Sequence, residues 1–145
     1  MANIRNVSEV ERIVGRWHAS DLAFIEELNL GFSSDHSSWD MVVTFLAVRR
    51  DTAKGGWPGD NNPRFRVVIR FCSTVDLELK HFSGPATQVM GFDLIDISDR
   101  GWEGKAFLAE DYEEGLISFL CKSVEILSAT PISGTNTYRV SQQVY

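Results

Sequence analysis

The stretch Trp39–Val48, WDMVVTFLAV, decides the fold class of this chain, together with Arg64–Cys72, RFRVVIRFC, which follows the next loop. The first stretch is apolar on both faces and rich in β-branched and aromatic residues, a composition typical of a central strand. In the second, apolar residues alternate with arginines, which predicts one buried face and one charged face. The polar loop between them, Asp51–Pro63, then connects two strands of one core.

The same alternation continues along the chain. In Val75–Leu79 the apolar residues face one way and the acids face the other. If this strand lies beside Arg64–Cys72, its acids meet the arginines of that strand. Further strands are predicted at residues 21–30, 87–97, 105–110, 116–127 and, as an edge strand, 135–145. A helical stripe also fits residues 21–30. A turn is predicted at 98–101, and Gly115 is expected in a hairpin loop.

A single helical pattern lies near the N-terminus. Ser8 and Glu11 have the spacing of a capping box, in which each side chain satisfies a free backbone amide of the other residue. Apolar residues then recur at helical spacing, at Val10, Ile13, Val14 and Trp17. This stripe predicts a helix over residues 9–18, weakened by roughly 1 kcal/mol at Gly15 relative to alanine.

Dense strands after one short helix argue against a βαβ fold. We predict a mainly β (α+β) fold, with the N-terminal helix and at least six antiparallel strands in a β-sandwich or strongly curved sheet. The chain of 145 residues has the size of a single domain, which we place at 1–145. Trp17 and Trp39 are expected in its core.

Composition and charge exclude several functional classes. No apolar run approaches the ~18 residues that cross a bilayer, and the N-terminus lacks the apolar region of a signal peptide. We therefore expect a cytoplasmic protein without a membrane partner. The formal net charge is −6. Nucleic-acid binders usually carry a basic patch and a high pI, so no nucleic-acid partner is expected.

The residues that could carry catalysis or bind metal do not form known motifs. Cys72 and Cys121 lie in apolar runs, which favours buried free thiols, with a disulfide as the alternative, and the lack of Cys-x-x-Cys spacing argues against zinc. His18 lies three residues before Asp21, but no nucleophile motif accompanies this pair. His36 is expected to be solvated, and His81 to be partly buried. We expect no enzyme activity, metal or cofactor.

An acidic segment spans residues 93–114. It has eight acids and two bases and therefore sums to −6, the net charge of the whole chain. Its acids Asp93, Asp96 and Asp99 lack the alternate-residue spacing of an EF-hand loop, which argues against calcium. Trp102 lies inside the segment and Trp57 in another glycine-rich loop. Each tryptophan could pin its loop to the core, stack on a sugar or anchor a partner.

Five stretches between residues 17 and 127 form a recognisable succession. They are His18-Ala-Ser-Asp-Leu-Ala, Phe65-Arg-Val-Val-Ile-Arg-Phe, Val75-Asp-Leu-Glu-Leu, Gly115-Leu-Ile-Ser-Phe and Ser123-Val-Glu-Ile. This succession resembles the β-rich immunity proteins of bacterial polymorphic-toxin systems, although two residues separate His18 from Asp21, which departs from the group's pattern. The resemblance implies a non-enzymatic protein that binds and blocks a cognate toxin, often a basic nuclease.

The acidic segment is the predicted binding surface for such a basic protein partner, because charges of one sign steer association. Trp102 is the predicted central anchor, since Gly101 and Gly104 leave it little local cover. The predicted partner-binding residues are Asp96, Asp99, Trp102, Glu103, Asp111, Glu113 and Glu114. The alternative is a β-sandwich module that binds a carbohydrate or small molecule through Trp57 and Trp102.

Overall fold

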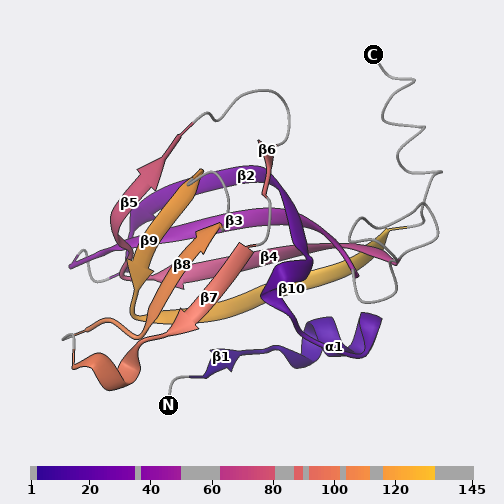
Figure 1. Cartoon of the computed structure of the whole chain (residues 1–145), viewed down its shortest axis with the longest axis horizontal. Helices are drawn as coiled ribbons and strands as arrows, with labels where there is room; N and C mark the ends of the chain where they lie inside the picture. The colour runs from indigo at the N-terminus through magenta and orange to yellow at the C-terminus, as the bar shows by residue number, and fades with distance from the viewer. Residues whose placement is uncertain are drawn as a thin grey trace.

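The computed structural model describes residues 3–34, 37–49, 63–80, 87–89, 92–101, 104–111 and 116–132. These residues form two β-sheets and one α-helix, which confirms the predicted mainly β fold. Figure 1 shows the strands of the two sheets layered on each other, with the helix at one side. No helix among these residues is long and apolar enough to span a membrane.

The large sheet has six strands, in which every neighbouring pair is antiparallel except the parallel pair β1–β10. In spatial order they are β1 (Ile4–Arg5), β10 (Ser123–Ile132), β4 (Arg64–Cys72), β3 (Trp39–Val48), β2 (Leu22–Phe32) and β6 (Thr87–Gln88). The small sheet has four antiparallel strands. They are β5 (Val75–Leu79), β9 (Ile117–Cys121), β8 (Phe107–Asp111) and β7 (Phe92–Asp96).

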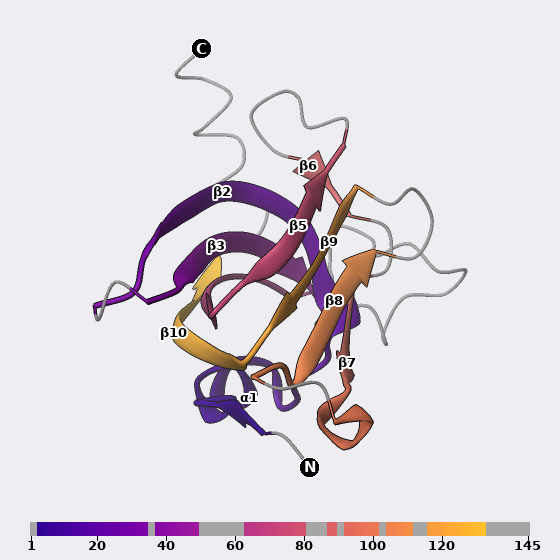
Figure 2. The same ribbon diagram turned by 90° about the vertical axis from the view of Figure 1, so that its left-hand side faces the viewer.

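The core lies between the two sheets. The large sheet curls, and the small sheet lies across its concave side (Figure 2). Aromatic pairs join the layers, since the rings of Phe71 on β4 and Phe119 on β9 meet edge to face with centroids 4.8 Å apart. As the alternation predicts, the inward side chains of β4 are fully buried, namely Phe65, Val67, Ile69 and Phe71.

The helix α1 spans Ser8–Val14 and is shorter than predicted. Gly15 ends it in a left-handed conformation with φ +79°, where its N–H donates to the Glu11 carbonyl. Glycine adopts this conformation without a Cβ penalty, so the C-cap outweighs the apolar stripe that continues to Trp17. The predicted capping box is also wrong, because Val7 is the N-cap and no side chain caps the helix. Trp17 packs against the core from beyond the helix.

Several strand predictions need correction. Residues 21–30 do form a strand, but 87–97 contains two, β6 and β7, and 116–127 is divided at Lys122 between the small and large sheets. Two short 3₁₀ turns, η1 (Ala19–Asp21) and η2 (Ser98–Arg100), join the neighbouring elements. The predicted strand at 135–145 and Gly115 lie outside the described residues.

Trp39 is not a core residue, in contrast to the prediction. Its side chain is 46% exposed and stacks on Phe32, with ring centroids 4.1 Å apart. The two residues pair across β2 and β3 at the ends of these strands nearest their connection. This part of the hairpin extends past the buried core. The alternation of apolar residues continues there, and Phe32 and Trp39 are therefore exposed and stacked on one another.

Candidate functional site

The outer face of the small sheet carries apolar side chains on all four strands. Val75 on β5 lies opposite Leu120 on β9, Leu120 lies opposite Leu108 on β8, and Leu108 lies opposite Ile95 on β7. We call these four side chains the apolar row. Val75 is 40% exposed and the other three are half-buried. Contiguous apolar side chains at a surface are typical of contact sites, whereas single ones are common everywhere.

A row of acids lies next to the apolar row. Glu78 on β5 faces Ser118 on β9, Ser118 faces Glu110 on β8, and Glu110 faces Asp93 on β7. We call these four residues the acidic row. Its three carboxylates have no hydrogen-bond or ion-pair partner within the described residues. Like charges directly opposite one another, as at Glu110 and Asp93, destabilise a sheet.

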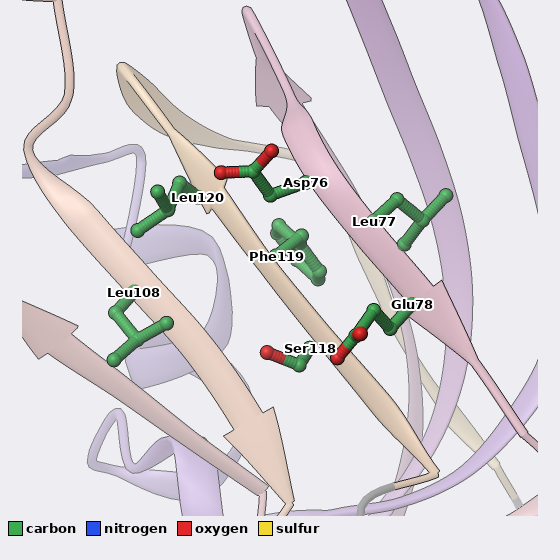
Figure 3. A pocket seen from close by; sticks show the side chains of 7 residues that line it. All are labelled: Asp76, Leu77, Glu78, Leu108, Ser118, Phe119 and Leu120. Atoms are coloured by element: carbon green, nitrogen blue, oxygen red, sulfur yellow. The ribbon is translucent and has the colours of Figure 1, made fainter.

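A bulge in β5 opens a shallow hollow between the two rows. The register between β5 and β9 shifts between Val75 and Glu78, and Asp76 has a left-handed φ of +54°. A bulge bends its strand and redirects the side chains around it. The resulting depression has a volume of about 450 Å³. Figure 3 shows Leu108, Leu120, Ser118 and Glu78 around it, with the Asp76 carboxylate at its rim.

Among the predicted partner-binding acids that the structure describes, Asp96 and Asp99 lie at the opposite end of the β7–β8 pair from Asp111. Asp96 and Asp99 are exposed at the end of β7, where Asp96 Oδ1 accepts hydrogen bonds from the Ser98 N–H (2.9 Å) and hydroxyl (2.6 Å). Asp111 is only 5% exposed, and its Oδ1 accepts a hydrogen bond of 3.1 Å from the Ile117 N–H. Asp111 is therefore buried in the free chain, and its predicted contact with a partner stays a prediction.

The remaining predicted site residues lie outside the described part of the chain. They are Trp57, Trp102, Glu103, Glu113 and Glu114. The connection that carries Trp102 joins β7 to β8, directly beyond Ile95 and Leu108 of the apolar row. Gly101 and Gly104 in this connection have left-handed φ angles of +74° and +71°.

Of the residues considered for catalysis, Asp21 and Cys121 are buried within the fold and His18 is exposed. Arg16 holds the buried Asp21 through two hydrogen bonds, of 2.5 and 3.2 Å, while His18 is exposed. Burial raises the pKa of the Cys121 thiol to about 12, so the thiol stays protonated and weakly nucleophilic. Among the described residues, no three His, Cys, Asp or Glu side chains are close enough to hold a metal ion. His36 and His81 lie outside these residues.

Sequence reasoning missed Glu78, and it counted Asp93 and Glu110 only as part of a charged segment. The spacing signal was present, since Asp93 and Ile95, Glu110 and Leu108, and Ser118 and Leu120 are each two residues apart. That period places both members of a pair on one face. The alignment of these pairs into rows depends on the register between strands, which the sequence does not display.

Comparison of the chain with models of protein families, with curated proteins and with solved structures finds no match.

Proposed function

We propose that this chain is a non-enzymatic protein-binding domain that acts in the cytoplasm and docks a basic partner protein on the outer face of the small sheet. The observation that carries this proposal is the apolar row, flanked on the same face by acids that have no ion-pair partner among the described residues. The resemblance to immunity proteins supports a partner that is the toxic domain of a bacterial toxin. Neutralisation then consists of covering the toxin's basic surface.

The two rows serve different steps of binding. The carboxylates of Glu78, Glu110 and Asp93 attract a basic surface over long range and raise the association rate. The apolar row removes water on contact and therefore controls dissociation. A lysine or arginine between Glu110 and Asp93 relieves their mutual repulsion, so the face is more stable in a complex than alone.

Trp102 remains part of this proposal. By sequence it lies in the connection between β7 and β8, and these two strands carry Ile95 and Leu108 of the apolar row. Large aromatic side chains in the centre of an interface often dominate its binding energy. We expect Trp102→Ala mainly to speed dissociation, at a cost of about 2 kcal/mol in binding free energy.

Binding kinetics with the toxic domain encoded next to this gene test the proposal. Glu78→Lys should slow association and flatten its dependence on ionic strength, because it reverses one charge of the acidic row. Glu11→Lys, on the exposed surface of α1, is the control because it changes the net charge equally. Equal association rates for the two variants contradict the proposed face.

A second pair of variants tests the apolar row. Val75→Arg places a bulky charge at its 40% exposed end, whereas Leu127→Arg does the same at a 43% exposed leucine on β10 of the large sheet. We expect Val75→Arg to raise the dissociation rate at least about tenfold and Leu127→Arg to leave it unchanged. Absence of any toxin gene beside this gene would remove the immunity role and leave the protein-binding face to be tested with other basic proteins.

A further inference from the structure

Most of the outer edge of β2 has no strand beside it in the described part of the chain. The two-residue strand β6 covers only Phe24 and Ile25, whereas β2 continues to Phe32. Figure 1 shows β2 as the outermost long strand of the large sheet. A long edge presents backbone donors and acceptors to any chain that can pair with them.

The ladder between β2 and β3 shows which backbone groups face this edge. The Ser33 N–H donates to the Ser38 carbonyl (2.8 Å), so Ser33 and Ser38 form a hydrogen-bonded pair. Hydrogen-bonded pairs alternate along an antiparallel ladder. The regular register beyond Glu27 therefore directs the backbone groups of Leu28 and Leu30 away from β3 and toward the open edge.

The side chains beside this edge are also unusually apolar for a surface. Leu30 is 47% exposed, Phe32 is 60% exposed and Trp39 is 46% exposed. All three extend the inward face of the hairpin, which carries the buried Met41 and Val43 further along. The edge of β5 differs, because Asp76 introduces a bulge and charged residues alternate along that strand. Bulges and charges are the usual means of blocking edge pairing.

We propose that two copies of this chain form a dimer by antiparallel pairing of their β2 edges around a two-fold axis at Leu30. This arrangement places Leu30 opposite its own counterpart and Leu28 opposite Phe32 of the second copy. The acids Glu26 and Glu27 then face Ser34 and Ser33 instead of one another. The exposed apolar side chains of both copies meet on one face, and the surface is thereby complementary to itself, as a two-fold interface requires.

Sedimentation equilibrium over about a hundredfold range of concentration tests the dimer. Leu30→Pro removes the outward N–H, and proline is tolerated on a strand where the N–H faces solvent. We expect this variant, and Leu30→Lys, to raise the dimer dissociation constant at least about tenfold. Leu127→Lys, at a leucine of similar exposure, should leave it unchanged. Circular dichroism checks that each variant is folded. If Leu30→Pro does not fold, the dimer dissociation constant of Leu30→Lys alone tests the proposal.

Ionic strength separates this interface from the proposed partner face. Two copies that each carry a net charge of −6 repel one another, so added salt should strengthen the dimer, whereas it should slow association with a basic partner. A chain that stays monomeric at every concentration overturns the proposal. A dimer that persists in Leu30→Lys also overturns it, because its interface then lies elsewhere.

Discussion

The outer faces of the two sheets differ in how their charged side chains are paired. On the large sheet, Arg66 of β4 donates to both carboxylate oxygens of Glu26 on β2, at 2.7 and 3.3 Å. Arg70 of the same strand donates to Glu125 on β10. On the small sheet, the carboxylates of the acidic row have no such partners among the described residues. The charges on the first face pair within the fold, whereas those on the second are the ones we propose to meet a partner.

The placement of β5 causes this difference. Had β5 paired with β4, its acids would have met the arginines, as one reading of the sequence expected. Instead β5 pairs with β9 in the small sheet, and β10 takes the place beside β4. The arginines therefore pair with Glu26 and Glu125, while Glu78 joins Glu110 and Asp93, none of which has an ion-pair partner among the described residues.

The largest expected effect separates the inner and outer faces of one strand. Phe119 and Leu120 are consecutive on β9, but Phe119 is 1% exposed between the sheets and Leu120 belongs to the apolar row. We expect Phe119→Ala to lower the free energy of unfolding by about 3–5 kcal/mol through the cavity it leaves. Leu120→Ala should lower it by far less and should weaken partner binding. Urea unfolding with the binding kinetics checks this; similar losses of stability contradict the assigned faces.

The next effect concerns the paired charges of the large sheet. Glu125→Gln removes the carboxylate that Arg70 and Arg5 both approach, the latter at 3.8 Å. The side chain of Arg70 is 40% exposed, so solvent screens the pair and we expect a loss of no more than about 1 kcal/mol. Glu110→Gln on the small sheet should cost no stability. A larger loss from Glu110→Gln, measured by urea unfolding, contradicts the contrast between the faces.

The same pair gives the large sheet a dependence on pH. The hydrogen bond from Arg70 lowers the pKa of Glu125 below its usual value. The pair therefore stabilises the fold fully above the unfolded pKa of about 4.3, and this contribution is lost as pH falls through the lower, folded-state pKa. Unfolding free energies measured between neutral and acidic pH should fall less steeply for Glu125→Gln than for the natural chain. Identical slopes would show that Glu125 does not contribute.

Much of the fold could be predicted from the alternation of apolar and polar residues, and the predictions that failed did so for physical reasons. The buried face of β4 was predicted in full, because a period of two assigns each residue to a face. The partner of β5 was not predictable. The two residues before it suggest a hairpin with β4, but Thr74 donates its N–H to the Trp39 carbonyl and Ser73 has a φ of +54°. This hydrogen bond and this backbone conformation direct the chain from β4 in the large sheet to β5 in the small sheet.

The candidate site was predictable only as a charged segment. Asp111 belongs to that segment by sequence, yet it faces inward and accepts a hydrogen bond from Ile117, since one step along a strand reverses the side chain. Glu78 lies far from the segment by sequence but joins its acids through β9. Composition identifies an excess of charge, whereas register decides which charges share a surface.

The smallest expected effect tests the acidic row in the free protein. Asp93 and Glu110 lie directly opposite one another without a described cation between them, and such pairs destabilise a sheet by about 0.2–1 kcal/mol. Asp93→Asn should therefore raise the free energy of unfolding by a few tenths of a kcal/mol at low ionic strength. Added salt should shrink this gain, because it screens the repulsion in the natural chain. Paired urea titrations at low and high salt measure the difference. A loss of stability in Asp93→Asn would mean that the carboxylate stabilises the fold, and the acidic row would then resemble the paired charges of the large sheet.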